Sequence, residues 1–175
     1  EALLNSPRLP SGFMFTMAPE TLYVLADGLA GAMNYYQETI NRFKDKISYI
    51  HMQYYNSGSM NGADGQAHNV ATEGFVVELT KAMINRFDLH PSQVAIGLPA
   101  TSQAAGSGYM PATQVANALN SLLTTYPDLR GAMTWSVNWD KTSSYEFMNN
   151  CHSILSQLGP VDPDSVVETA GTGTV

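Results

Sequence analysis

Four short apolar runs, separated from one another by helical patterns, constrain the fold of this chain more than any other feature. The apolar runs cover residues 13–20, 47–56, 93–100 and 131–138. The helical patterns cover residues 35–45, 72–87, 112–125 and 144–158. Strands that alternate with helices in this way form a parallel sheet covered by helices. The sequence therefore predicts an α/β fold.

The connections between these elements differ in length at the two ends of the predicted sheet. Long loops follow the strands, at residues 21–34, 57–71 and 101–110, whereas the helix-to-strand connections are short. Barrel enzymes of the (β/α)8 class build their sites from loops at the carboxyl ends of the strands. Four strands cannot close such a barrel, so the pattern predicts half of one. Residues 160–175 lack periodicity and are interpreted as a tail or linker.

The composition excludes several classes of protein. Hydrophobic residues make up 44% of the 175 residues and charged residues only 13%, which is the opposite of the signature of a disordered chain. The net charge of −7 argues against nucleic-acid binding, because duplex affinity comes largely from clustered cations. Apolar runs are far shorter than the ~20 residues that span a bilayer. A single cysteine, Cys151, excludes an internal disulfide and is interpreted as a buried apolar side chain.

The run 47–56 has one face that is unexpectedly polar for a strand in a parallel sheet. Period-two alternation places four side chains on that face: Tyr49, His51, Gln53 and Tyr55. Strands buried in parallel sheets are usually apolar on both faces, and an unpaired buried polar group costs about 1–3 kcal/mol. Two interpretations stay open, namely a polar barrel mouth that faces a ligand and a set of satisfied hydrogen bonds in the core.

Four strand-end segments together carry a recognisable family pattern. They are Thr-Met-Ala-Pro-Glu at 16–20, Met-Gln-Tyr-Tyr-Asn at 52–56, Ile-Gly-Leu-Pro-Ala at 96–100 and Gly-Ala-Met-Thr-Trp-Ser-Val-Asn-Trp-Asp at 131–140. In this order they resemble the ends of strands five to eight in bacterial chitinases of glycoside hydrolase family 18. The resemblance covers about residues 10–158. It implies that residues 1–159 form the C-terminal half of a (β/α)8 barrel.

The resemblance also implies an activity. Members of that family hydrolyse β-1,4 bonds between N-acetylglucosamine units by substrate-assisted retention, unlike the usual two-carboxylate scheme. Their proton donor is the glutamic acid of an Asp-x-x-Asp-x-Asp-x-Glu motif at the end of strand four, and this chain contains no such motif. The expected parent protein is therefore a secreted chitinase, and this chain alone is expected to be inactive. A non-catalytic chitin-binding lectin on the same fold is the alternative.

Two aromatic residues match the family's sugar-binding site. Tyr55 matches the tyrosine that hydrogen-bonds the acetamido group, a role that suits a phenol because it donates without ionising at neutral pH. Trp135 matches the tryptophan that forms the apolar floor of the −1 subsite, where an indole stacks on the C–H face of a pyranose. Packing inside the barrel is the alternative for both side chains.

Four further residues belong to the same motifs. Gln53 is expected to bind the N-acetyl group, with core hydrogen bonding as the alternative, and Asn56 lies beside the matched tyrosine. Glu20 is expected to face the cleft and bind substrate hydroxyls or a neighbouring carboxylate, unless it is a surface carboxylate. Met17 is expected to line the cleft wall.

No cofactor or metal is expected. The four histidines lie on separate elements without the spacing of metal ligands. The glycine-rich segment 105–109 is followed by Met-Pro rather than by the Gly-Lys-Ser/Thr of a phosphate loop, which disfavours a third interpretation, a nucleotide-binding α/β domain. The expected partners are chitin or N-acetylglucosamine oligomers and the missing N-terminal half of the barrel, with neither nucleic acid nor membrane.

Overall fold

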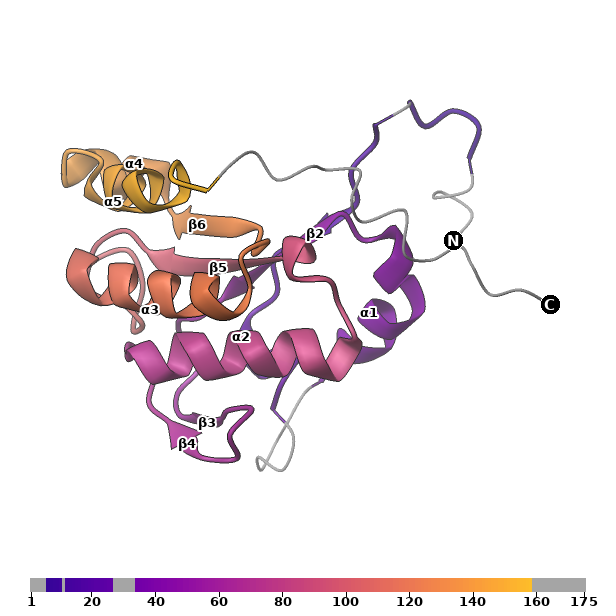
Figure 1. Ribbon diagram of the computed structural model, residues 1–175, viewed down its shortest axis with the longest axis horizontal. Coiled ribbons are helices and arrows are strands. Elements are labelled where there is room, and N and C mark those ends of the chain that lie inside the picture. Colours follow the sequence, from indigo (N-terminus) through magenta and orange to yellow (C-terminus); the bar gives the residue numbers. More distant parts are fainter. Residues whose placement is uncertain (1–5, 11, 27–33, 159–175) are drawn as a thin grey trace.

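A four-stranded parallel sheet forms the centre of the protein (Figure 1). The structure, a computed structural model, describes residues 6–10, 12–26 and 34–158 of the chain. The strands stand in the order β1-β2-β5-β6. Their bounds are Thr16–Met17 for β1, Tyr49–Gln53 for β2, Val94–Pro99 for β5 and Gly131–Trp135 for β6. The parallel order confirms the predicted α/β fold class.

Five α-helices accompany the sheet in the described part of the chain. They are α1 (Gln37–Phe43), α2 (Glu73–Phe87), α3 (Ala112–Thr125), α4 (Val137–Thr142) and α5 (Glu146–Leu155). Short 3-10 turns cover Thr21–Tyr23, Lys44–Lys46 and Pro91–Gln93. Helices α2 and α3 run side by side along one face of the sheet (Figure 1). None of the described helices is both long and apolar enough to cross a bilayer.

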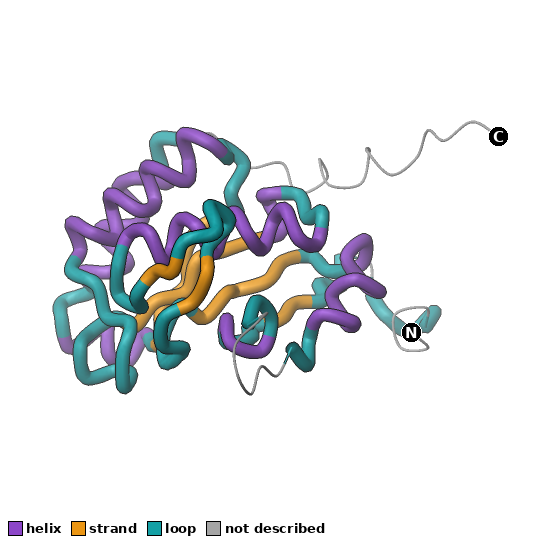
Figure 2. The backbone as a smooth tube through the Cα atoms, turned by 90° about the horizontal axis from the view of Figure 1, so that it is seen from below, coloured by secondary structure: helices purple, strands orange, loops and turns teal. Residues whose placement is uncertain are grey.

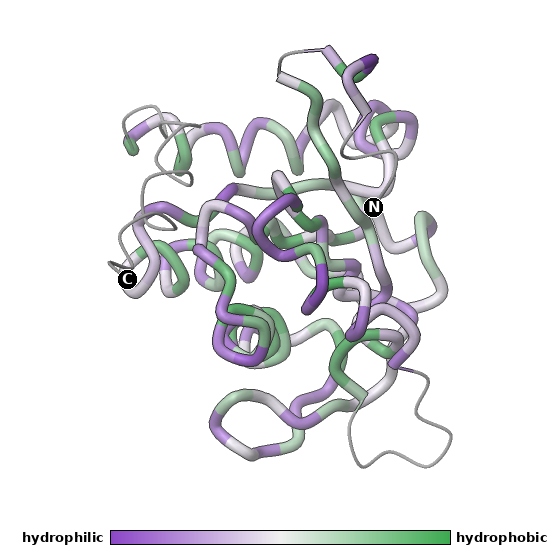
Figure 3. Tube along the Cα trace, turned by 90° about the vertical axis from the view of Figure 1, so that its right-hand side faces the viewer, coloured by the Kyte–Doolittle hydropathy of each residue, from purple (hydrophilic) through white to green (hydrophobic). Residues whose placement is uncertain are grey.

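Most residues at the helical spacing of α2 and α3 are buried, but Arg86, which follows the same spacing in α2, is exposed. Phe75, Leu79 and Met83 follow one another at intervals of four residues and are fully buried, as are Ala118 and Leu119 in α3. Helix α2 begins where the Thr72 side chain accepts a hydrogen bond from Phe75 N. Figure 3 shows hydrophobic and hydrophilic stretches alternating along the helices, as expected when one side of each packs inward.

The register of the sheet separates two faces. Partner residues on neighbouring parallel strands lie on the same side of the sheet. One row joins Glu20, Gln53, Gly97 and Met133, and we call the side to which it belongs the open face. The other side, which we call the helix-covered face, carries Ile50, Met52 and Tyr54, all with no exposed surface. Figure 2 shows the strands of the sheet in orange, side by side.

Two local structures were not predicted. The loop 57–71 contains an antiparallel hairpin of β3 (Met60–Asn61) and β4 (Ala67–His68). The last predicted strand, 131–138, ends at Trp135, and helix α4 begins at Val137. Within α4, the buried Asp140 carboxylate accepts hydrogen bonds from the Phe147 and Met148 amides at the start of α5.

The predicted domain limits are only partly within the described residues. The tail or linker expected at residues 160–175 lies outside them, and so does the end of the barrel segment at residue 159. Pro111 precedes the first residue of α3 as its N-cap. The lone Cys151 is buried, as predicted.

Candidate active-site face of the sheet

Four of the predicted site residues lie at the carboxyl ends of the strands on the open face. Glu20 bridges to Gln53 in parallel register, and Trp135 pairs with Pro99. Pro99 lies two residues beyond Gly97, the partner of Gln53, so Trp135 shares the face of Gln53. Tyr55 follows Gln53 by two residues, in the bend beyond β2, and the charge of Glu20 acts on its phenol. Parallel strands are about 4.8 Å apart, so the ends of β2 and β6 lie about 10 Å apart across β5.

Tyr55 is a buried phenol with an electrostatic partner on the open face. Only 4% of the residue is exposed, and no described residue hydrogen-bonds its hydroxyl. Burial raises the pKa of Tyr55 above its ordinary value, and the Glu20 carboxylate raises it further. The phenol therefore keeps its proton at neutral pH and can act as a hydrogen-bond donor.

Gln53 ties the end of β1 to the end of β2. Its Nε2 donates to the Ala18 carbonyl at 2.6 Å, and its backbone N–H donates to the Pro19 carbonyl at 3.0 Å. Its own carbonyl accepts from Thr21 Oγ1 at 2.8 Å. The amide thus makes a structural hydrogen bond through nitrogen, which fits the alternative interpretation of this residue. Its oxygen Oε1 makes no hydrogen bond with the described residues.

Glu20 lies on the open face, beyond the end of β1. It is half-buried at the end of β1, immediately before the turn Thr21–Tyr23. Its bridge to Gln53 places it on the open face, and its charge acts on the Tyr55 phenol. Glu20 is therefore a carboxylate beside the buried phenol.

Trp135 ends β6 with much of its surface uncovered. It is 54% exposed, and its carbonyl accepts a hydrogen bond from Ala100 N at 2.9 Å. The peptide bond to Ser136 is cis. The other described residues therefore leave much of the indole uncovered. Its apolar surface is available to a flat, weakly polar ligand such as a sugar ring.

Met17 does not join the other predicted residues. It pairs with Ile50 and packs against the hydrophobic core, so it belongs to the helix-covered face. Because side chains alternate along a strand, only positions of the parity of Thr16 and Glu20 reach the open face. The expectation that Met17 lines the cleft wall is therefore corrected.

Asn56 contacts a loop. Its backbone is left-handed, with φ of 59°, a conformation that Asn tolerates better than most residues. Its N–H donates to Ser107 Oγ at 3.1 Å, and its Oδ1 accepts from Ser107 N at 3.2 Å. The polar atoms of Asn56 thus hold the loop 101–110.

Sequence reasoning missed Met133, which lies in the same row as Gln53 and two residues before Trp135. Its register with Gly97 puts it on the open face, and a Cβ at Gly97 would lie 2.7 Å from Met133 Cε. Glycine at position 97 therefore leaves the space that the Met133 side chain occupies. The signal was available in principle, since Met133 precedes Trp135 by two residues, but the period-two pattern of this strand was not followed.

Lower on the open face, three side chains form an aromatic and cationic cluster. The Arg130 guanidinium lies over the Tyr49 ring at 4.5 Å from its centroid, and the Tyr49 and His51 rings are 5.0 Å apart. Burial and the charge of Arg130 both lower the pKa of His51. His51 is therefore held neutral beneath the strand ends.

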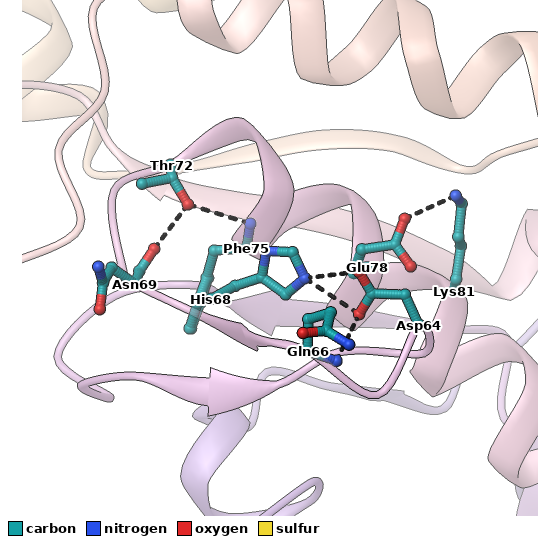
Figure 4. A network of polar contacts seen from close by, with 8 residues as sticks. All are labelled: Asp64, Gln66, His68, Asn69, Thr72, Phe75, Glu78 and Lys81. Atoms are coloured by element: carbon teal, nitrogen blue, oxygen red, sulfur yellow. Dashed lines mark hydrogen bonds and ion pairs between the residues drawn. The ribbon is translucent and has the colours of Figure 1, made fainter.

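A second polar network lies apart from these strand ends, where the β3–β4 hairpin meets α2 (Figure 4). His68 Nε2 contacts both carboxylate oxygens of Asp64 at 3.1 Å, and Lys81 pairs with Glu78. The Gln66 amide donates to Asp64 Oδ1, and this bond is the main reason that the pKa of Asp64 is lowered. Within the described residues, no group of three or more His, Cys, Asp or Glu side chains could hold a metal ion.

Two hollows elsewhere in the described part of the chain do not include Tyr55 or Trp135. One lies between the end of β5 and helices α3 and α5, lined in part by Tyr109, Phe147 and Asn150. The other lies before β1, beside Phe13, Phe15 and Lys46.

The sequence is similar to those of several curated chitinases. No family model matches the sequence. Chitinase D of Niallia circulans is 33% identical over 184 residues, which cover 90% of this chain and 35% of that protein. Chitinase Chi52 of Paenibacillus xylanexedens is 32% identical over 184 residues, which also cover 90% of this chain and 35% of that protein. The chain therefore spans about a third of the length of these curated relatives.

A solved structure is similar over most of the described chain. A family GH18 chitinase from Chromobacterium violaceum matches with a TM-score of 0.74 and 32% sequence identity, over 83% of this chain and 46% of that chain. This match and the parallel sheet confirm the predicted fold class, a partial (β/α)8 barrel.

Proposed function

Since this chain belongs to glycoside hydrolase family 18, we propose that it supplies the acetamido-binding and ring-stacking side of a chitinase active site. The parent protein would hydrolyse β-1,4 bonds between N-acetylglucosamine units. The observation that carries this proposal is the placement of Tyr55 and Trp135 at the carboxyl ends of two strands of one sheet. Tyr55 lies two residues past the end of β2 and is acted on by the charge of Glu20, and Trp135 is the last residue of β6, with β5 between the two strands.

In the proposed reaction, one N-acetylglucosamine ring lies on the Trp135 indole. The oxygen of its 2-acetamido group attacks the anomeric carbon and forms a C–O bond, while the glycosidic C–O bond breaks and the leaving oxygen takes a proton. The proton comes from a carboxylic acid outside this chain, because the chain contains no Asp-x-x-Asp-x-Asp-x-Glu motif. Water then attacks the anomeric carbon from the side that the leaving group vacated and returns a proton to the same carboxylate. The C–O bond to the acetamido oxygen breaks, which restores the acetamide and retains the configuration.

Tyr55 would stabilise the charge that develops on the acetamido group. Its pKa is raised by burial and by Glu20, which keeps the phenol protonated. Its hydroxyl has no hydrogen-bond partner among the described residues, so it is available to the substrate. Removing one preorganised donor of this kind costs about 10²–10³ in kcat.

The rest of the barrel is the proposed partner of this chain. In the described sheet, β1 and β6 are the two edge strands, and each leaves backbone groups without a strand partner on one side. The open face also lacks a facing layer of strands in the described part. Strands elsewhere in the parent protein would cover both edges and bring the proton donor to the site. The chain alone would be inactive, and secretion of the parent is proposed because chitin is an insoluble polymer outside cells.

The test is an assay of the full-length parent on N-acetylglucosamine oligomers. Tyr55→Phe should lower kcat by about 10²–10³ with little change in KM, because the hydroxyl acts mainly in the transition state. Tyr126→Phe is the matched control, since Tyr126 ends α3, away from the open face. Equal turnover in the two variants would remove Tyr55 from this role. A parent that binds the oligomers without hydrolysing them would favour the lectin alternative.

A further inference from the structure

The loop 101–110, between β5 and α3, is fastened to the chain segment that carries Tyr55. Asn56 and Ser107 are 51 residues apart in sequence and exchange two hydrogen bonds. Asn56 N donates to Ser107 Oγ at 3.1 Å, and Ser107 N donates to Asn56 Oδ1 at 3.2 Å. Such a reciprocal pair fixes the two backbones relative to each other, because it joins a side chain and an amide from each side.

Gly108 brings the same loop directly against Tyr55. A Cβ added at Gly108 would clash with Tyr55 Cβ, would lie 2.6 Å from Tyr55 Cα and would lie 2.9 Å from the Tyr54 carbonyl oxygen. Its φ of +99° is also one that L-residues rarely adopt. The position therefore requires glycine for two reasons, and the loop backbone packs on the root of the tyrosine side chain.

This packing explains how Tyr55 is oriented. Its hydroxyl makes no hydrogen bond with the described residues, so no polar contact of its own fixes the phenol. Contact at Cα and Cβ restricts the side chain to few rotamers, and the residue is 4% exposed. The loop supplies the restraint that the hydroxyl does not.

We propose that Asn56, Ser107 and Gly108 form a clasp that positions Tyr55 for the reaction. The inference rests on the proposed function, because it assigns the clasp a role only through the Tyr55 hydroxyl. It also gives Asn56 a role different from the substrate contact expected from its place beside the tyrosine. Ser107 and Gly108 are positioning residues, and neither touches substrate in this account.

The first test is Ser107→Ala in the full-length parent, which removes the acceptor of the Asn56 N–H. We expect kcat on N-acetylglucosamine oligomers to fall about 3- to 10-fold, the loss equivalent to one hydrogen bond, with KM unchanged. Ser102→Ala is the matched control, because Ser102 is exposed in the same loop and makes no hydrogen bond with the described residues. Equal kcat in the two variants would overturn the proposal.

A second variant, Gly108→Ala, displaces the loop from Tyr55. Since a shift of about 1 Å can cost roughly 10²-fold in rate, its kcat should fall further than that of Ser107→Ala. Gly65→Ala is the control for backbone strain, because Gly65 has φ of +74° but a Cβ there would meet nothing within 4 Å. Similar losses of kcat in both glycine variants would count against a contact with Tyr55.

The decisive readout is a double variant. If the clasp acts through the Tyr55 hydroxyl, Ser107→Ala should lower kcat in the wild-type background and have no further effect in the Tyr55→Phe background. Additive losses would mean that Ser107 acts in some other way, and would overturn the clasp while leaving the proposed function intact. Full activity of Tyr55→Phe would instead overturn the proposed function, and the clasp with it.

Discussion

Tyr54 and Tyr55 are adjacent in sequence, but removing their hydroxyls should have opposite consequences. Tyr54 lies on the helix-covered face with no exposed surface, and its hydroxyl lies 2.7 Å from Thr80 Oγ1. Thr80 Oγ1 already donates to the Val76 carbonyl, so Tyr54 is the donor in the pair. Burial also raises the pKa of Tyr54. This phenol therefore stabilises the fold and has no access to substrate.

The size of the effect follows from these contacts. Tyr54→Phe removes one buried hydrogen bond but leaves Thr80 with its bond to Val76, so the free energy of unfolding should fall by about 1 kcal/mol. Thr80→Val leaves the buried Tyr54 hydroxyl without an acceptor, and should cost more, about 1–3 kcal/mol. In the double variant both polar groups are gone, so the loss should be smaller than the sum of the two single losses.

The assay is urea denaturation of the full-length parent and its three variants, with turnover on N-acetylglucosamine oligomers measured in parallel. Turnover should be unchanged by Tyr54→Phe, in contrast to Tyr55→Phe. The reasoning is refuted if Thr80→Val is no more destabilising than Tyr54→Phe, or if Tyr54→Phe lowers kcat.

Three other predictions concern single residues. Trp135→Ala should lower the free energy of unfolding by less than the ~3–5 kcal/mol lost at a core aromatic, since Trp135 is 54% exposed, and denaturation measures this. The same variant should weaken oligomer binding at least about tenfold, which calorimetry measures. Burial raises the pKa of Cys151 to about 12, so its reaction with a disulfide reagent at pH 8 should occur only on unfolding, and rapid labelling of folded protein would contradict this. The Gln66 amide and His68 lower the pKa of Asp64 from 3.8, so their stabilisation of the hairpin is present above that value and lost as pH falls through the lower folded pKa. The Gln66 amide NMR shift should titrate with a midpoint below 3.8, and a midpoint at or above that value would refute the assignment.

The strands and the main helices could be predicted because their apolar periodicities are local. The stripe of Phe75, Leu79 and Met83 is visible in the sequence and is buried in the structure. Helix α4 could not be predicted in the same way, since Ser136–Asp140 follows directly on an apolar strand. The contact of its Asp140 carboxylate with the amides at the start of α5 spans seven and eight residues and is not visible as a local pattern.

Among the site residues, too, relations within one strand could be predicted, whereas contacts between distant segments could not. The alternation within β2 correctly predicts that Tyr49, His51 and Gln53 share one face, because that relation lies within one strand, whereas Tyr55 lies in the bend beyond it. Met17 was expected to line the cleft wall, but its pairing with Ile50 puts it on the helix-covered face. No local sequence pattern specifies that pairing. The role of Asn56 depends on Ser107, 51 residues away, and only the folded chain brings the two together.

The most direct test of the central claim is a crystal structure of the full-length parent with a bound N-acetylglucosamine oligomer. The account predicts one sugar ring on the Trp135 indole, with the Tyr55 hydroxyl about 2.7–3.0 Å from an acetamido atom of that ring. An oligomer bound on another surface, in contact with neither residue, would contradict it.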